Sequence, residues 1–372
     1  MFMWIIIFVF IILLAISSIS YTSNCLYKSL TELCSKKISR KQVFAIVLIL
    51  FFVIGLLISF INAFIVFLYL TFFLIISDIL HLIIKRVFNN SKVRFIVTII
   101  AVLCAVFTLL VGWYLDHSVV RTEYNITTDK NVPDLKILMF ADSHVGTTFD
   151  GDGFAKHIAE MQKENADIVF LVGDFVDDDT TVEDMKKASF ALGKLKTPLG
   201  IFFVHGNHDK GYYGDSRGFS TQQLEEELHK NGVVILKDES KTVKDGFYSV
   251  IGRKDLSVVK ELKQSRLSPE ELLTGVTSSN KYAIVLDHQP YEYDLLSEAR
   301  ADLVLSGHTH GGQLFPFNQV GKLIGAVDLV YGIEKRSSTD FIVTSGISDW
   351  AIKFKTGTRS EYVVINVKSR RK

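Results

Sequence analysis

The chain has 372 residues and a formal net charge of +1, with 48% hydrophobic and 22% charged residues, and this apolar content excludes an intrinsically disordered protein. The net charge of the whole chain hides a division near residue 118. Nine Lys/Arg and three Asp/Glu precede this point (net +6), whereas 32 Lys/Arg and 37 Asp/Glu follow it (net −5). The apolar first third excludes a purely soluble protein, and the acidic remainder argues against a nucleic-acid-binding protein, which would present a basic surface.

Long apolar runs at the start of the chain predict an all-α transmembrane region of about four helices. Residues 1–16 are almost continuously apolar, and residues 43–84 contain no Lys or Arg. A spanning helix needs about 20 residues, so the second run predicts two helices separated by a turn near residues 59–62. Residues 95–115 supply the last helix. We expect a multi-pass protein of the cell membrane.

Basic residues between the predicted helices set the orientation. Residues 28–41 carry five bases and residues 85–94 carry four, which places both segments in the cytoplasm by the positive-inside rule. The chain then leaves the fourth helix outward, so the part after about residue 119 is predicted to be extracytoplasmic. The first helix is expected to stay uncleaved, because no basic residue precedes its apolar run as in a signal peptide. Asp78 and His81 are interpreted as interfacial residues at the end of the third helix.

The remainder of the chain shows the pattern of an α/β fold. Residues 119–134 are polar and are predicted to be a linker between a transmembrane region of residues 1–118 and a folded domain of residues 135–372. In that domain, short apolar runs bounded by glycine and polar residues predict buried strands. These runs are residues 136–141, 167–172, 201–204, 282–286 and 302–305. Helical patterns separate several of them, at residues 154–164, 182–195 and 222–230.

Each of the five predicted strands ends in residues that can bind a metal ion. The residues are Asp142 and His144, Asp174, Asn207 and His208, His288, and finally His308 and His310. A single residue of this kind at a strand end would more often have a structural role. In layered α/β folds, however, the loops at the carboxyl ends of strands form the functional site. Five strand ends that each carry such a residue are improbable by chance. Imidazole and carboxylate ligands without cysteine suit Mn, Fe, Zn or Co rather than Ca. A shared carboxylate would make a two-metal hydrolytic site.

The motifs at these strand ends resemble those of the calcineurin-like metallophosphoesterase superfamily, over about residues 136–367. They read Asp142-x-His144, Gly173-Asp174-x-x-Asp177, Gly206-Asn207-His208-Asp209, His288 and Gly307-His308-x-His310. The closing Gly-His-Thr-His-Gly-Gly-Gln is similar to the branch of bacterial phosphodiesterases that includes YaeI and YkuE, several members of which carry amino-terminal membrane spans. The resemblance implies a four-layer αββα sandwich after the transmembrane region.

The resemblance also implies the role of each residue. It implies two divalent ions, with Mn favoured, one held by Asp142, His144, Asp174 and His310 and the other by Asp174, Asn207, His288 and His308. Asp174 would bridge them, Asn207 would also hold a phosphoryl oxygen, His208 would assist departure of the leaving oxygen, and Asp177 would orient His208. Asp178-Asp179 stands where the superfamily's protein phosphatases have Arg-Gly, and Asp209 stands in place of their Glu. Both differences argue against a phosphoprotein phosphatase.

These features together predict a membrane-anchored, metal-dependent phosphohydrolase. We expect a phosphodiesterase that cleaves a lipid head group or a cell-envelope polymer outside the cytoplasmic membrane, with no nucleic-acid partner. One alternative is a cytoplasmic-facing pyrophosphatase of a nucleotide-linked lipid, which requires the inverted topology. Another is a catalytically inactive membrane sensor or binding module, against which the complete ligand set argues. The sequence indicates no oligomeric state.

Overall fold

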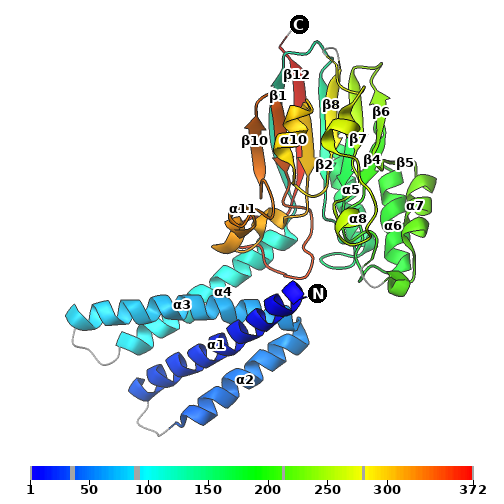
Figure 1. The fold of residues 1–372 in the computed structure, drawn as a ribbon. Helices are drawn as coiled ribbons and strands as arrows, with labels where there is room; N and C mark the ends of the chain where they lie inside the picture. Colours follow the sequence, from blue (N-terminus) through cyan, green and yellow to red (C-terminus); the bar gives the residue numbers. More distant parts are fainter. Residues whose placement is uncertain (1, 34–37, 88–92, 212–213, 279–280, 371–372) are drawn as a thin grey trace. The chain divides into compact units, whose positions relative to one another are not determined.

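The computed structural model describes residues 2–33, 38–87, 93–211, 214–278 and 281–370, in two compact units, Met1–Trp113 and Tyr114–Lys372 (Figure 1). Four long helices account for most of the first unit. They are α1 (Phe2–Leu33), α2 (Arg40–Leu57), α3 (Phe60–Val87) and α4 (Val93–His117). All four are long and apolar enough to cross a bilayer. The prediction of about four spanning helices is confirmed in number, and a short break at residues 58–59 separates α2 from α3.

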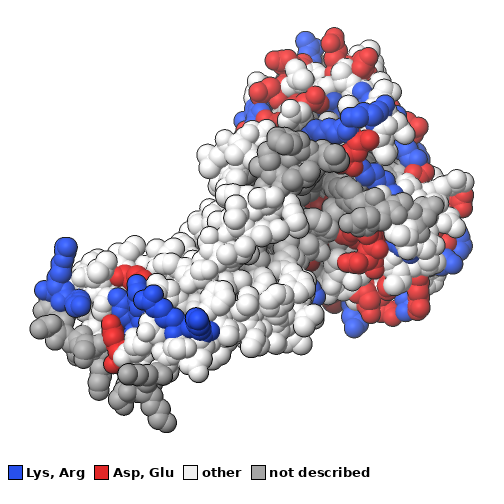
Figure 2. Space-filling view, turned by 60° about the horizontal axis from the view of Figure 1, so that its bottom comes forward, with Lys and Arg blue, Asp and Glu red and all other residues white. Residues whose placement is uncertain are grey.

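The charged side chains of the helical unit gather at one end on the face that Figure 2 shows. Figure 2 shows Lys, Arg, Asp and Glu side chains there, whereas most of the helical surface is uncharged. At this end the Asp78 carboxylate pairs with Arg94 Nη1 at 2.7 Å and accepts a hydrogen bond from Tyr21 at 2.9 Å. This pairing favours a structural role for Asp78. Residues 34–37 and 88–92, which hold part of the basic segments used to predict orientation, lie outside the described residues.

The second unit is built on two six-stranded sheets. The first has the order β1 (Val120–Thr128), β12 (Glu361–Ser369), β2 (Leu135–Phe140), β3 (Ile168–Val172), β4 (Ile201–Val204) and β5 (Val233–Ile235). The second has the order β10 (Gly332–Arg336), β11 (Thr339–Val343), β9 (Leu303–Ser306), β8 (Tyr282–Leu286), β7 (Tyr248–Gly252) and β6 (Glu239–Val243). Strands β2 to β5 are parallel, and so are β7, β8, β9 and β11. Helices connect most of the parallel strands, as this topology requires.

Three layers of apolar side chains hold the sheets and helices together. Phe170 and Phe202 belong to the core between the two sheets. Leu192 belongs to the core that joins the first sheet to α5 (Gly151–Met161), α6 (Val182–Gly193) and α7 (Thr221–Lys230). Tyr293 belongs to the core that joins the second sheet to α9 (Pro269–Leu273) and α10 (Tyr293–Glu298). The predicted four-layer αββα sandwich is therefore confirmed.

The expected linker differs from the structure. Residues 120–128 form the edge strand β1, which pairs in parallel with the carboxy-terminal strand β12. Its side chains alternate between half-buried and exposed, with Ile126 buried, so the segment lacks the apolar run by which the other strands were recognised. Strand β12 in turn pairs antiparallel with β2. The folded unit therefore begins before residue 135.

Burial of Phe170 predicts a large loss of stability on truncation. Phe170→Ala should lower the free energy of unfolding by about 3–5 kcal/mol, because it leaves a cavity between the sheets. Thermal denaturation of the full chain in detergent would show a melting temperature lower by roughly 10 °C. Phe190→Ala is the matched control, since the Phe190 side chain on α6 is 56% exposed. An equal shift in both variants would contradict this account of the core.

Candidate metal centre

The predicted ligands meet at one edge of the sandwich, which we call the metal edge. They follow the carboxyl ends of β2, β3, β4, β8 and β9, five parallel strands of the two sheets. Three groups of possible ligands form there, and within each group one ligand atom per residue lies within 4.8 Å of the others. One of them joins His144 to Asp177 and His208, and the other two are the candidate metal clusters. The first cluster is Asp142, His144 and His310, and the second is Asp174, His288 and His308. All six residues are buried or half-buried.

Asp174 links the two clusters. Its Oδ2 atom lies 3.7 Å from Nε2 of His144 in the first cluster and 3.1 Å from Nε2 of His288 in the second. Its Oδ1 atom accepts a hydrogen bond from the backbone N–H of His208 at 2.8 Å. Neither imidazole Nε2 atom makes a hydrogen bond among the described residues. A carboxylate oxygen with two inward-facing imidazole nitrogens is the arrangement expected of a ligand shared by two ions.

The opposite nitrogens of these rings are held by the surrounding protein. His288 Nδ1 donates to the carbonyl of Val172 at 2.8 Å, and His310 Nδ1 donates to the carbonyl of Ser348 at 3.1 Å. A carbonyl can only accept, so each neutral ring must carry its proton on Nδ1 and its lone pair on Nε2. Such outer contacts fix the tautomer and the orientation of metal-binding histidines.

Asp177 contacts two histidines rather than one. Its Oδ2 atom lies 2.8 Å from His144 Nδ1, and its Oδ1 atom lies 3.5 Å from His208 Nδ1. The sequence had suggested a contact with His208 alone. Burial opposes ionisation of Asp177, but the hydrogen bonds from His144 and His208 hold the pKa of this carboxyl below its usual range. Asp177 can therefore orient a ligand of the first cluster and the nearby His208 with the same carboxylate.

The loop after β4 brings Gly206 and His208 against Asp174, the residue predicted to bridge the two ions. A Cβ atom added at Gly206 would lie 2.1 Å from Asp174 Oδ1, so no larger residue fits without moving this carboxylate. The two chain neighbours of Asn207, Gly206 and His208, both lie against Asp174. The His208 ring lies 4.9 Å from the His144 ring and 5.1 Å from the half-exposed ring of Trp350. His208 and Trp350 thus lie together beside the first cluster.

Most of the predicted ligands have a strained backbone. The φ angles are +53° for Asp142, +36° for His144, +51° for Asp174, +71° for His308 and +48° for His310. Residues with a side chain avoid this left-handed region, at a cost on the order of 1–3 kcal/mol each. The hydrogen bonds around the clusters are what hold them there, for example from the backbone N–H of His308 to both carboxylate oxygens of Asp142, at 3.0 and 3.1 Å.

Two buried residues support the clusters but were given no role from the sequence. The Asp209 carboxylate accepts hydrogen bonds from four backbone N–H groups, including those of Asp174 at 2.9 Å and Gly206 at 2.7 Å. Lys355 Nζ donates to the carbonyls of Ser345 and Ser348, and Ser348 also accepts from His310. The position of Asp209 inside a motif could have indicated its importance. Nothing in the sequence pattern distinguishes Lys355 from a surface lysine.

The electrostatics of the clusters fit divalent cations. Burial raises the pKa of Asp142 to about 6, and burial together with the charge of His288 lowers the pKa of His308 to about 4. Without cations this interior therefore disfavours ionisation of Asp142, while it keeps His308 neutral as a metal ligand must be. For Asp174, burial opposes ionisation, but His288 and His208 hold the pKa of the carboxyl well below its usual range. Two carboxylates and four imidazoles supply hard and intermediate ligands suited to first-row divalent ions. The residues therefore fit a dinuclear site.

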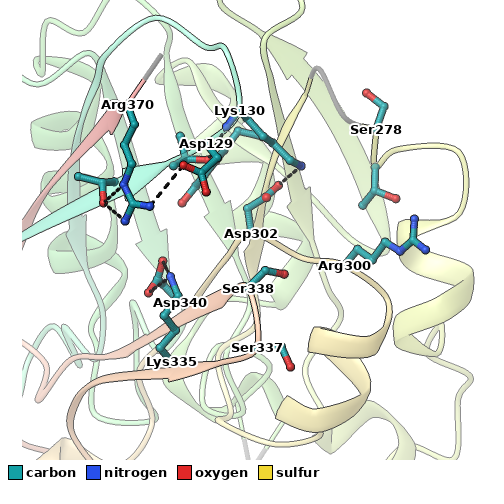
Figure 3. Close-up of a pocket in the computed structure, with 14 residues that line it drawn as sticks. Asp129, Lys130, Ser278, Arg300, Asp302, Lys335, Ser337, Ser338, Asp340 and Arg370 are labelled. Atoms are coloured by element: carbon teal, nitrogen blue, oxygen red, sulfur yellow. Dashed lines mark hydrogen bonds and ion pairs between the residues drawn. The ribbon is translucent and has the colours of Figure 1, made fainter. Parts of the chain in front are cut away.

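A separate large cavity lies away from the metal edge. It has a volume of about 780 Å³ and is lined by residues at the amino ends of β8 and β11 and the carboxyl ends of β1 and β12, so it lies at the opposite edge (Figure 3). Three ion pairs line it, Lys130–Asp302 at 2.7 Å, Lys335–Asp340 at 3.1 Å and Arg370–Asp129 at 3.3 Å. Arg300 also lines the cavity, outside these three ion pairs. Among the described residues, the cavity contains none of the groups of possible metal ligands, so the metal edge is the candidate site.

Comparisons with known proteins agree with this geometry. Residues 135–312 match the family described as Calcineurin-like phosphoesterase. The chain is 30% identical over 261 residues to an uncharacterized metallophosphoesterase of Campylobacter jejuni, covering 68% of this chain and 66% of that protein. It is 30% identical over 243 residues to a Danio rerio protein named Transmembrane protein with metallophosphoesterase domain, covering 63% and 53% of the two chains. It is 26% identical over 260 residues to the uncharacterized metallophosphoesterase YkuE of Bacillus subtilis, covering 68% and 87%. The chain thus spans less than two thirds of the length of either of the first two relatives.

The position of Asp174 predicts that its charge is needed for metal binding. Asp174→Asn should leave the chain with at most about one of two ions, because the shared oxygen loses its negative charge. Metal analysis of the purified full chain by mass spectrometry measures this directly. Asp179→Asn serves as the control, since Asp179 is exposed and belongs to neither cluster. Full metal content in the Asp174 variant would contradict the bridging role.

Proposed function

The chain belongs to the calcineurin-like phosphoesterase family, and we propose that it is a membrane-anchored, two-metal hydrolase of phosphodiesters. The observation that carries this proposal is the Asp174 carboxylate between two imidazole Nε2 atoms, one from each cluster. We assign Asp142, His144, Asp174 and His310 to one ion, and Asp174, Asn207, His288 and His308 to the other. Manganese is our favoured metal.

The residues around the clusters supply the rest of the reaction. Two bound divalent ions would activate water and neutralise charge on the phosphoryl oxygens. His208 lies beside the first cluster with Asp177 at its Nδ1 atom, so its Nε2–H can protonate the leaving oxygen. Asn207 contributes its side-chain amide to a phosphoryl oxygen. In the net reaction the hydroxyl of one water bonds to phosphorus, the P–O bond to the leaving group breaks, and the water proton ends on that oxygen.

Charge beside the site supports a diester rather than a monoester substrate. Asp178 and Asp179 follow Asp177 directly, where the superfamily's protein phosphatases have Arg-Gly. A phosphomonoester is largely a dianion at neutral pH, whereas a diester carries a single charge and is repelled less by these carboxylates. A diester of the membrane or cell envelope is consistent with the four apolar helices.

Turnover of small esters tests the proposed chemistry. The metal-free full chain in detergent, given Mn²⁺, should hydrolyse bis(p-nitrophenyl) phosphate faster than p-nitrophenyl phosphate. His208→Ala should lower kcat on the diester by about 10²–10⁴-fold, because a positioned acid is lost. His229→Ala is a matched control, since His229 lies on α7 away from the clusters. No hydrolysis of either ester by a chain that holds two ions would refute the proposal and favour the sensor alternative.

The proposed orientation has its own test. We propose that the second unit is extracytoplasmic, on the basis of the basic segments at residues 28–41 and 85–94. An alkaline phosphatase fused after Lys372 should be active, because that reporter matures only outside the cytoplasm, and a fluorescent protein that folds only in the cytoplasm should stay dark. The reverse pattern would support the cytoplasmic-facing pyrophosphatase.

A further inference from the structure

An exposed apolar segment lies next to the metal centre. Residues 311–327 contain Lys322 as their single charged residue, and Lys322 pairs with Glu334 at 3.1 Å. The segment follows His310 and includes η4 (Phe317–Gln319) and α11 (Val320–Leu323). Leu323 is 81% exposed and Ile324 is 72% exposed. Other large apolar side chains exposed on the segment are Phe315, Phe317 and Val320. A cluster of this kind marks an interaction surface on a folded protein.

A groove connects this segment to the metal centre. It has a volume of about 370 Å³, and the predicted metal ligand His308 is one of the residues that line it. Apolar side chains line much of the remainder, namely Leu314, Phe317, Val327, Val330 and Ile352. The volume is within the roughly 300–1,000 Å³ of ligand pockets, which are mostly apolar with a few polar groups that orient the ligand. A molecule with its phosphorus at the clusters could therefore place an apolar substituent in this groove.

The chain enters the second unit at the same edge. Only residues 118–119 separate the end of α4 from Val120, the first residue of β1. Val120 is in register with Glu361, whose N–H donates to the carbonyl of Gly346 at 2.9 Å. A Cβ added at Gly346 would lie 2.7 Å from the Asp142 Cβ. Three residue steps lead from His117 to Val120 and span about 11 Å at most, so the metal edge is tethered close to the end of a predicted membrane span.

From these observations we infer that the enzyme works on a lipid surface. The exposed apolar side chains of residues 315–324 seat in the lipid, and the groove beside His308 takes an acyl chain of a phosphodiester lipid that is cleaved at the metals. This inference rests on the proposed function and narrows its substrate to a lipid. The tether favours a bilayer as the occupant, because it keeps the metal edge within reach of a lipid surface. The near absence of charge on residues 311–327 favours lipid insertion as well.

Two phosphodiester substrates that share the p-nitrophenyl leaving group distinguish docking on the lipid surface from the hydrolysis step itself. The full chain in phosphatidylcholine nanodiscs is given either soluble bis(p-nitrophenyl) phosphate or a diacylglycerol p-nitrophenyl phosphodiester within the disc. Leu323→Asp combined with Ile324→Asp should lower kcat/KM on the lipid diester about tenfold, because charged side chains oppose insertion, and leave the soluble diester within about twofold. Phe190→Asp, an exposed apolar position on α6, should change neither. No loss on the lipid diester, or an equal loss on both, would overturn the inference.

A fluorescence measurement tests docking without any turnover. With Cys25, Cys34 and Cys104 replaced by alanine, Leu323→Cys is labelled with bimane in nanodiscs that contain brominated phosphatidylcholine. We expect strong quenching at position 323 and little at a matched Phe190→Cys. Equal quenching at the two positions would refute insertion even if both diesters are cleaved. Hydrolysis of neither diester together with quenching at position 323 would refute the proposed function and leave docking supported.

Discussion

The structure of the second unit depends on burying several ionisable groups at one place. Asp142, Asp174 and the neighbouring imidazoles lie in an interior where an uncompensated charge is costly. The outer nitrogens of His144, His288 and His310 are held by Asp177 or by backbone carbonyls, and Asp142 accepts from a backbone N–H group. The charge of the neighbouring His288 favours the ionised form of Asp174, and divalent cations between the groups would balance both carboxylates. The strained backbone at five of these residues is tolerated because the same contacts determine it.

The strand ends were predictable because they combine two independent signals, a short apolar run and a metal-binding side chain after it. Strand β3 was expected at residues 167–172 and is found at Ile168–Val172. The edge strand β1 escaped prediction because its outward side chains are polar, and pairing with β12, over 230 residues away, decides its conformation. The contacts of Lys355 and the double role of Asp177 arise only when distant loops meet, so no local pattern indicates them. The exposure of residues 315–324 could not be predicted from the sequence either, because the same apolar residues would be equally suitable for a buried core.

Strand direction explains why so much is gathered at one edge. Because β12 runs antiparallel to β2, and β1 runs parallel to β12, the first residue of β1 lies at the carboxyl end of β2, where Asp142 and His144 follow. The antiparallel strand β12 thus places the start of β1, where the chain enters the second unit, at the metal edge. The cavity lined by Lys130 and Asp302 is left at the other edge, remote from the ligands.

The place of β12 in the first sheet has a consequence for synthesis. This strand, Glu361–Ser369, lies between β1 and β2, although more than 220 residues separate it from either along the chain. Until residues 361–369 have been synthesised, β1 has no partner in the sheet and one side of β2 is open. Domains that can fold early usually do so as they emerge, whereas this one must wait for its final strand. In the extracytoplasmic orientation proposed above, this delay would keep the nascent polypeptide unfolded during its passage through a translocation channel.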